Sequence, residues 1–352
     1  MFNELLYIKI NPMADLRTTY MGIELKSPII AGASNMVTDI HNLHKLEEAG
    51  VAAIVYKSLF EEQVQLENLE LSERMTEYEE RHAEQITLFP NSHSVPESPD
   101  EYLLNLKKAR EAVSIPLFAS LNAIKDEVWV EYAIKAAATG VNGLELNFYS
   151  LPDESGKTGA AIEKAQLETL RKVKAAVKIP VAVKLSPYYT NPVQLITELD
   201  RAGADAVVIF NRLLQPDIDI FAEQHTMPYN LSSSDDNKLP LRFAGMLHGN
   251  IRASVCTSTG VYSGNDVVKM ILAGADAVQA VSTIYSNGID VIKSMTGEVA
   301  KWMDGHGYKT ITSFRGKLSM SRSENKLPYQ RAQYIDFMMN SGDIMKKYKT
   351  LN

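Results

Sequence analysis

Cysteine is nearly absent from this chain of 352 residues, because Cys256 is the one cysteine in the sequence. An internal disulfide and a cysteine-based metal cluster are therefore excluded, and the scarcity fits a reducing compartment. Long apolar runs are also lacking, since no stretch approaches the roughly 18 consecutive apolar residues of a membrane-spanning helix. We expect a cytoplasmic protein that does not enter a membrane.

Clusters of basic residues are missing as well. No basic run is longer than a pair, and the formal net charge is −7. A nucleic-acid-binding protein would normally carry a basic face, so no nucleic-acid partner is predicted. The opening MFNELLYIKI lacks the basic start and cleavage site of a signal peptide. We interpret residues 1–15 as a leader, with a second candidate start at Met13.

The composition does support a large core, because 45% of the residues are hydrophobic and 22% are charged. Short apolar runs alternate with helical patterns along the chain. The candidate strands are residues 28–32, 52–57, 116–121, 143–148, 180–185, 206–210, 253–256 and 277–281. The phrases EEAGVAAIV, RAGADAVVI and LAGADAVQA repeat one device, in which a helix ends near Ala-Gly and a buried strand follows. This alternation predicts an α/β fold, a (β/α)8 TIM barrel over residues 16–304, with a doubly wound open sheet as the alternative.

Two connections and the tail are longer than a barrel requires. Residues 58–100 follow strand 2 and residues 211–238 follow strand 6, at the carboxyl end of the barrel where active sites form. Such loops serve as lids or substrate walls, although NLSSSDDNK also fits a mobile surface insertion. Residues 305–352 form a C-terminal extension that would cap the barrel or contact a neighbouring subunit.

Histidines supply no metal site in this interpretation. His41 and His44 are three residues apart, but they lie in DIHNLHKLEEAG, which has the pattern of a helix face. Asp39 stands where a helix would begin, so an N-cap is its predicted role.

Polar residues stand at the ends of four predicted strands: Lys57, Asn147, Lys184 and Asn211. Amides both donate and accept hydrogen bonds, which suits a planar amide-rich ring, and a fixed ammonium stabilises an anion that develops on a ring. Reduced flavin is such an anion. A single lysine at a strand end could instead extend its charge to water, but four groups converging on one mouth favour a binding site.

A phosphate site is predicted after the last two strands. Gly260 follows strand 7, Gly264 precedes a helix that begins near Asn265, and Ser282 and Thr283 end strand 8. Backbone N–H groups and a helix N-terminus at these loops commonly hold phosphate, and glycine allows close approach.

Several segments together resemble the dihydroorotate dehydrogenase family over about residues 16–319. They are LRTTYMGIELKSPIIAGAS, VYKS, ELNFYS, VAVKLSPYYT, STGVYSGNDVVKMILAGADAVQAVSTIY and ITSFRGKLS. The resemblance implies an FMN-containing barrel that oxidises dihydroorotate to orotate in pyrimidine biosynthesis. It further implies a homodimer and a soluble electron acceptor or partner protein, since no membrane-linked N-terminal extension is evident.

The resemblance also implies roles for individual residues. Lys184 would face N1 and O2 of the flavin, and Asn147, Asn211 and Lys57 would contact substrate. The implied FMN-binding residues are Gly32, Ala33, Ser34, Lys57, Ser58, Asn122, Asn147, Lys184, Gly260, Val261, Ser282 and Thr283.

Ser150 falls where the family has its catalytic base, and Lys57 would assist in catalysis. The base would remove a proton from the substrate C5 while hydride leaves C6 for flavin N5. Serine is a weak base and needs a water relay or another activator. A loop hydroxyl bonded to nearby backbone is the alternative role, and the adjacent Tyr149 is a weaker competitor.

The sequence departs from the family pattern on the substrate side. The family has Cys/Ser-Pro-Asn where this chain has Ser150-Leu151-Pro152-Asp153, and residues 60–100 lack the family's Asn-Ser-Met-Gly-like segment. Thr259-Gly260 also replaces the family's Gly-Gly. Two alternatives therefore stay open: a flavin enzyme acting on another dihydropyrimidine or an enoyl-type compound, and a non-catalytic flavin-binding barrel.

Overall fold

Eight parallel strands form a closed ring in the computed structural model, which describes residues 14–62, 98–123, 125–149, 156–212, 215–226 and 231–339. Strand β3 pairs with both β4 and β13, and β4 also pairs with β6, so the sheet has no open edge in the ring. The strands are β3 (Ile29–Ala31), β4 (Ala53–Val55), β6 (Leu117–Asn122), β7 (Gly143–Phe148), β8 (Val181–Leu185), β9 (Ala206–Ile209), β12 (Ser254–Ser258) and β13 (Ala277–Ala280). The predicted (β/α)8 barrel is confirmed, and the open-sheet alternative is wrong.

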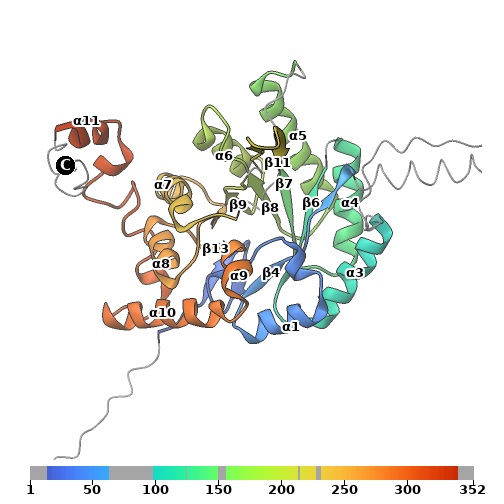
Figure 1. The fold of residues 1–352 in the computed structure, drawn as a ribbon, viewed down its shortest axis with the longest axis horizontal. Coiled ribbons are helices and arrows are strands. Elements are labelled where there is room, and N and C mark those ends of the chain that lie inside the picture. The colour runs from blue at the N-terminus through green and yellow to red at the C-terminus, as the bar shows by residue number, and fades with distance from the viewer. Residues whose placement is uncertain are drawn as a thin grey trace, which may run out of the picture.

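Helices surround the strand ring, as the view along the barrel in Figure 1 shows. They are α1 (Ile40–Glu48), α3 (Pro99–Ala112), α4 (Asp126–Ala138), α5 (Gly159–Ala176), α6 (Pro192–Arg201), α7 (Lys238–Leu247), α8 (Gly264–Ala273), α9 (Ser282–Asn287) and α10 (Val291–Gly305). Local signals set their ends. The Asp39 side chain accepts a hydrogen bond from the His41 N–H at 2.7 Å, as predicted for an N-cap. Gly274 ends α8 with a φ of 129°, a conformation that favours glycine.

A short hairpin closes the amino-terminal end of the barrel. Strands β1 (Thr18–Tyr20) and β2 (Ile23–Leu25) pair antiparallel and bring Tyr20 and Met21 into a buried cluster with barrel residues such as Phe118 and Cys256. The Tyr20 and Phe118 rings meet edge to face with centroids 5.9 Å apart. This end of the barrel, here called the floor, is therefore filled by apolar side chains.

The C-terminal extension helps to secure this floor. The Arg315 guanidinium lies 2.6 Å from the Asp276 carboxylate, and the Thr18 hydroxyl donates to the Asp276 carbonyl at 2.9 Å. Further along, the Gly316 N–H donates to the Ile271 carbonyl of α8. The extension includes η3 (Ile311–Ser313), η4 (Leu327–Tyr329) and α11 (Ala332–Met339). Its first part packs on the barrel, and the expected role as a cap or as a contact to a neighbouring subunit stays a prediction.

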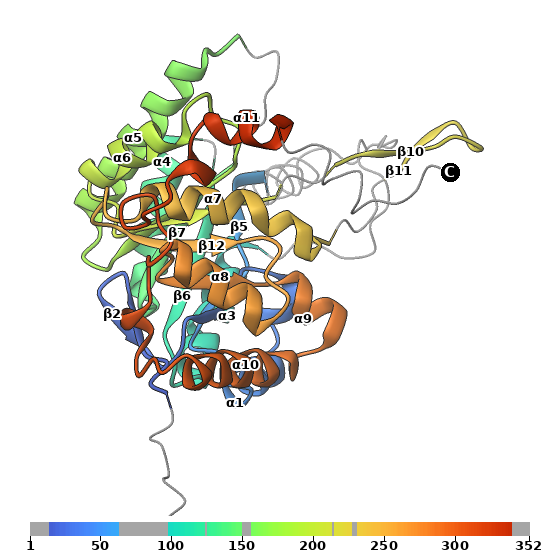
Figure 2. The ribbon, with the colours of Figure 1, turned by 90° about the vertical axis from the view of Figure 1, so that its left-hand side faces the viewer.

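The two long connections differ in what they build. After β4, strand β5 (Leu59–Phe60) adds to β6, and residues 63–97 lie outside the described part of the chain. After β9, strands β10 (Asp217–Asp219) and β11 (Gln224–Thr226) form an exposed hairpin that projects away from the barrel (Figure 2). The chain then returns through η2 (Ser234–Asn237) into α7.

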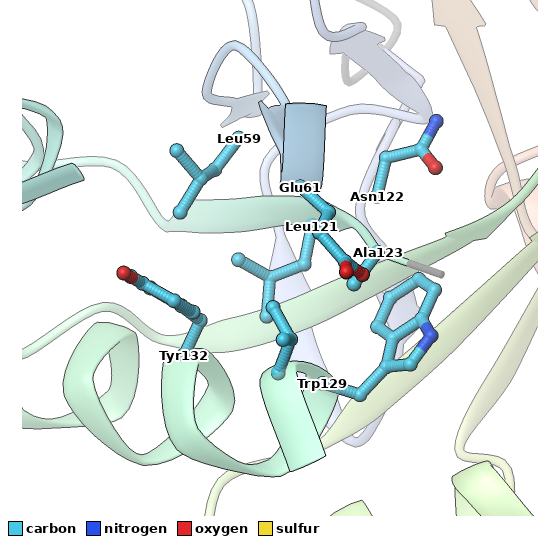
Figure 3. Close-up of a pocket in the computed structure, with 8 residues that line it drawn as sticks. Leu59, Glu61, Leu121, Asn122, Ala123, Trp129 and Tyr132 are labelled. Carbon is cyan, nitrogen blue, oxygen red and sulfur yellow. The ribbon is translucent and has the colours of Figure 1, made fainter. Parts of the chain in front are cut away.

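A small space between β6 and α4 is shown in Figure 3. Its volume is only about 10 Å³, which leaves no room for an organic ligand. The buried Glu61 carboxylate accepts a hydrogen bond from the Lys125 N–H at 2.8 Å and so satisfies the start of α4. The Asn122 amide points away from the Tyr132 ring in this view.

Candidate active site

The barrel interior changes from apolar to polar above the floor. On β7, Leu144 and Leu146 belong to the outer core, whereas Glu145 and Asn147 alternate with them. Glu145, Lys184 of β8 and Gln279 of β13 meet inside the ring, and all three are buried. Glu145 and Asn147 are therefore the inward-facing residues of β7, and Glu145 forms a polar layer inside the barrel with Lys184 and Gln279.

At the carboxyl end of the ring, the two predicted asparagines contact each other. The Asn211 amide donates to the Asn147 side-chain oxygen at 2.9 Å, and the Asn211 oxygen accepts from the Arg212 N–H at 3.0 Å. Asn147 and Lys184 also occupy paired positions on β7 and β8. These contacts fix the asparagines beside the lysine.

The loop after β12 forms a cradle with α9. Thr259 and Gly260 both have positive φ values, of 78° and 76°. A Cβ atom on Gly260 would lie 2.4 Å from the Asn237 nitrogen, so only glycine fits there. The Gly260 N–H donates to the Ser232 hydroxyl oxygen at 3.2 Å, and that hydroxyl lies 2.9 Å from the Ser282 hydroxyl. Two polar groups of the predicted phosphate site therefore converge on one oxygen atom.

The polar layer and the cradle enclose a single cavity of about 150 Å³. A second cavity of about 370 Å³ shares Asn211, Arg212 and Thr259 with it and extends toward α7. The lining residues of the first are Ala33, Lys184, Asn211, Arg212, Ser232, Ser258, Thr259, Gly260, Val261, Gln279, Val281 and Ser282. Predicted residues from five strand ends thus share one enclosed space, with a cation at one side and an amide cradle at the other.

Other predicted site residues lie nearby but do not line this cavity. Lys57 follows β4 at the same end of the barrel as Lys184, and Tyr102 of α3 donates to the Lys57 carbonyl at 2.8 Å. The Ser58 hydroxyl pairs with Ser120 at 2.7 Å.

Gly32 packs so closely against Val281 that a Cβ atom there would lie 2.6 Å from the valine methyl. Ser34 precedes the short helix η1 (Asn35–Val37) without capping it through its side chain.

Two features of the phosphate prediction need correction. Ser282 and Thr283 do not end strand 8, because β13 stops at Ala280 and both residues begin α9. The Thr283 side chain is fully buried and its hydroxyl donates to the Tyr262 carbonyl at 3.3 Å, so it turns away from the cavity. The strand was extended too far because Val281 continues its apolar pattern.

Ser150, the predicted base, lies outside the described residues, as do Leu151, Pro152 and Asp153. Its neighbour Tyr149 directly precedes that gap. The base assignment therefore stays a prediction.

Several residues of the cavity and the polar layer were missed from the sequence. They are Glu145 in its paired role and the lining residues Arg212, Ser232, Ser258, Thr259, Gln279 and Val281. Ser232 lies within the polar segment that also fitted a mobile insertion, yet it is buried against Gly260 and Ser282. The capping box of Ser233 and Asp236 was the available signal, because it marks a helix start and hence an ordered segment.

Burial raises the pKa of two side chains that could otherwise react, Cys256 and Tyr189. Burial, reinforced by the negative charge of Glu145, raises the pKa of the Cys256 thiol well above its usual value. Cys256 is thus an unreactive part of the core. Burial also raises the pKa of Tyr189 to about 12, and its hydroxyl is bonded to Gln166 outside the cavity.

The chain matches the family described as dihydroorotate dehydrogenase over residues 15–303. The chain belongs to the dihydroorotate dehydrogenase family. This span includes all eight barrel strands and every residue that lines the first cavity.

Individual relatives fall into two named groups within this family. The catalytic subunit of dihydroorotate dehydrogenase B (NAD(+)) from Methanocaldococcus jannaschii is 26% identical over 82% of this chain and 93% of its own length. The corresponding Thermoplasma volcanium subunit is 25% identical over 86% of this chain and 98% of its own. Dihydroorotate dehydrogenase A (fumarate) from Lactobacillus helveticus is 27% identical over 59% of this chain and 69% of its own.

Two features are absent from the described residues. None of the helices there is long and apolar enough to cross a membrane. Nor does that part of the chain hold a group of three or more histidine, cysteine or acidic side chains able to bind a metal ion.

Proposed function

We propose that the protein is an FMN-dependent oxidoreductase that converts dihydroorotate to orotate. The observation that carries the proposal is the shared cavity, where Lys184, Asn211, Gly260 and Ser282 meet in a barrel of the dihydroorotate dehydrogenase family. The relatives named as NAD(+) and fumarate forms of that enzyme support the same reaction.

The residues present fit FMN by their chemistry. Gly260 fits where a Cβ atom could not be accommodated, its N–H donates to the Ser232 hydroxyl, and Ser282 adds a second hydroxyl, a set of polar groups that suits phosphate oxygens. The Lys184 ammonium and the Asn211 amide suit the polar edge of a flavin ring. Gly260, Val261 and Ser282 would hold the phosphate, and Ala33, Lys57, Ser58 and Asn122 would complete the flavin site.

When bound, FMN supplies the N5 atom that accepts a hydride. Asn147 and Asn211 would orient the substrate, and their mutual hydrogen bond at 2.9 Å limits how each can rotate. Ser150 would remove the C5 proton while hydride leaves C6, which gives the C=C bond of orotate. Lys57, held by its backbone contact to Tyr102, would stand beside the substrate as the second catalytic group.

The experiment is anaerobic reduction of the FMN-loaded protein. Dihydroorotate should bleach the flavin absorbance near 450 nm, on the order of one flavin reduced per substrate oxidised. Replacing Ser150 with alanine should slow this bleaching by about 100-fold or more, the usual contribution of a positioned base. Full-rate bleaching by the Ser150→Ala protein would remove Ser150 from the mechanism. Bleaching by no dihydropyrimidine would favour the non-catalytic flavin-binding barrel.

A second candidate keeps the flavin and changes the substrate to another dihydropyrimidine. The observation in its favour is Ser150-Leu151-Pro152-Asp153, which lacks the family asparagine after proline. Comparing the bleaching rates with dihydroorotate and dihydrouracil separates the two candidates, because dihydroorotate carries a carboxylate that dihydrouracil lacks.

The proposal extends to the setting of the enzyme. We extend it to a soluble electron acceptor or partner protein, a homodimer and a cytoplasmic location. The NAD(+) and fumarate in the relatives' names support a soluble acceptor, and the single, buried cysteine fits a reducing compartment. Reoxidation of the reduced protein by NAD⁺ or by fumarate would distinguish the two kinds of acceptor named for its relatives.

A further inference from the structure

A hydrogen-bonded relay crosses the barrel from the cavity wall, where Lys184 and Gln279 lie, to Glu145. The Lys184 ammonium donates to the Gln279 oxygen at 2.9 Å, and the Gln279 amide nitrogen donates to Glu145 Oε2 at 2.5 Å. Gln279 comes from β13, which stands opposite β7 in the ring of eight strands. The relay therefore connects two sides of the barrel through its centre.

The order of charges in this relay fixes its geometry. A carboxylate only accepts hydrogen bonds and an ammonium only donates them, so Gln279 must turn its NH2 group to Glu145 and its oxygen to Lys184. Gln279 also lies close to Gly32, where an added Cβ atom would be 3.2 Å from the amide oxygen. Glu145 thus determines where the lysine finds its acceptor.

Glu145 also faces Lys184 directly. Its Oε1 atom lies 3.7 Å from the ammonium nitrogen and, within the described part of the chain, has no hydrogen-bond partner. The two side chains are 2% and 8% exposed, so solvent screens their interaction little. A buried carboxylate held in this way compensates the charge of the lysine.

We propose that Glu145 is a positioning residue that holds the Lys184 ammonium through Gln279 and offsets its charge beneath the flavin. The inference rests on the proposed function, because it assigns Lys184 to the flavin site. The offset has a definite sign: a negative charge below the ring opposes electron uptake, so Glu145 lowers the flavin reduction potential that Lys184 raises.

The first test is the midpoint potential of the FMN-loaded, full-length protein. Glu145→Gln should favour flavin reduction at least tenfold, which is about 30 mV upward for a two-electron couple. Glu145→Asp keeps the charge and should move the potential by less than a third of that shift. Thr257→Val is the matched control, since it changes a buried residue whose hydroxyl has no hydrogen-bond partner in the described part of the chain. An unchanged or lower potential in Glu145→Gln, or an equal shift in Glu145→Asp, would overturn the proposal.

The second test needs no flavin and covers the case in which Glu145→Gln folds poorly. Thermal midpoints of the FMN-free protein are compared for Glu145→Gln, Lys184→Met and the double variant. Because each single change leaves one buried charge uncompensated, the double variant should recover at least half of the loss summed over the singles. Additive losses would show that the two residues are not coupled and would reject the inference. A wild-type protein that cannot take up FMN would instead reject the proposed function, while this cycle would still report on the pair.

Discussion

The two ends of the barrel are built from different chemistry, although the same eight strands run through both. At the floor, Tyr20, Met21 and Phe118 form a buried apolar cluster that is closed by a hairpin. At the mouth, polar side chains replace the apolar ones: Asn147 on β7, Lys184 on β8 and Asn211 directly after β9. Two cavities lie at this end of the barrel. The difference teaches that the floor is built for stability, and it supports our proposal that the mouth is the binding end, as is general for this fold.

Removal of an aromatic ring from the floor should have the largest effect on stability. Phe118→Ala deletes a ring that is 1% exposed and contacts Tyr20, so unfolding free energy should fall by about 3–5 kcal/mol. Urea denaturation measures the loss. Ile134→Ala on α4 is the control, because Ile134 is 48% exposed and its replacement should change stability by only about 0.5 kcal/mol. If Phe118→Ala lowered the unfolding free energy as little as Ile134→Ala does, the floor would not be the part of the barrel that carries stability.

A change in the cradle should affect binding more than folding. Gly260→Ala adds a Cβ atom that would lie 2.4 Å from the Asn237 nitrogen. Loss of one charge-assisted hydrogen bond to phosphate corresponds to about 1.5–3 kcal/mol, or roughly 10- to 100-fold weaker FMN binding. Fluorescence titration of FMN measures it.

Gly288→Ala is the matched control for the cradle variant. Gly288 has nearly the same φ, 78°, but no atom lies within 4 Å of the added carbon. Its FMN affinity should equal that of the wild type. Equal weakening in both variants would mean that backbone conformation, rather than the cradle, governs the effect.

Breaking the ion pair at the floor should have an intermediate effect on stability. Arg315→Met leaves Asp276 without its cation, and with side chains 23% and 20% exposed the loss at pH 7 should be about 1–3 kcal/mol. Burial already raises the pKa of Asp276, and Arg315 counteracts that rise. The difference from wild type should therefore shrink as the pH falls and Asp276 becomes neutral. Arg17→Met, which breaks an exposed pair with Asp15, should change stability far less than Arg315→Met, because solvent screens that pair.

The smallest effect is expected where the extension meets the barrel at His248. Burial lowers the pKa of His248, and the nearby Arg322 and Arg315 lower it further. The unfolded chain then binds more protons than the native one, so stability falls as the pH drops below about 6.5. His248→Gln should flatten that part of the thermal stability curve. If the thermal stability of His248→Gln fell with pH as steeply as that of the wild type, His248 would not cause the pH dependence.

Periodicity was enough to predict the barrel but not all of its contents. The predicted strand at residues 143–148 matches β7, and the one at 180–185 differs from β8 by one residue, because buried runs and glycine stops are local signals. The same local signals extended strand 8 past Ala280, where the apolar Val281 belongs to the turn before α9.

Long-range partners could not be predicted from local patterns. Glu145 and Gln279 are 134 positions apart in the sequence, and Ser232 and Ser282 are 50 apart. Their contacts form only when the barrel closes, and a local stretch of sequence does not show which distant residues the closed barrel brings together. Lys184 and Asn211 were accessible to prediction because each stands at the end of an apolar strand, and every parallel strand end lies at the same mouth.

The contacts at Asp276 have a consequence for synthesis of the chain. Thr18 bonds to a residue 258 positions later, and Arg315 then closes on the same aspartate. During synthesis, the first hairpin must therefore wait until Asp276 and Arg315 have emerged before these contacts can form. Completion of the barrel is therefore a late step, and until then the unpaired strand edges are open to aggregation.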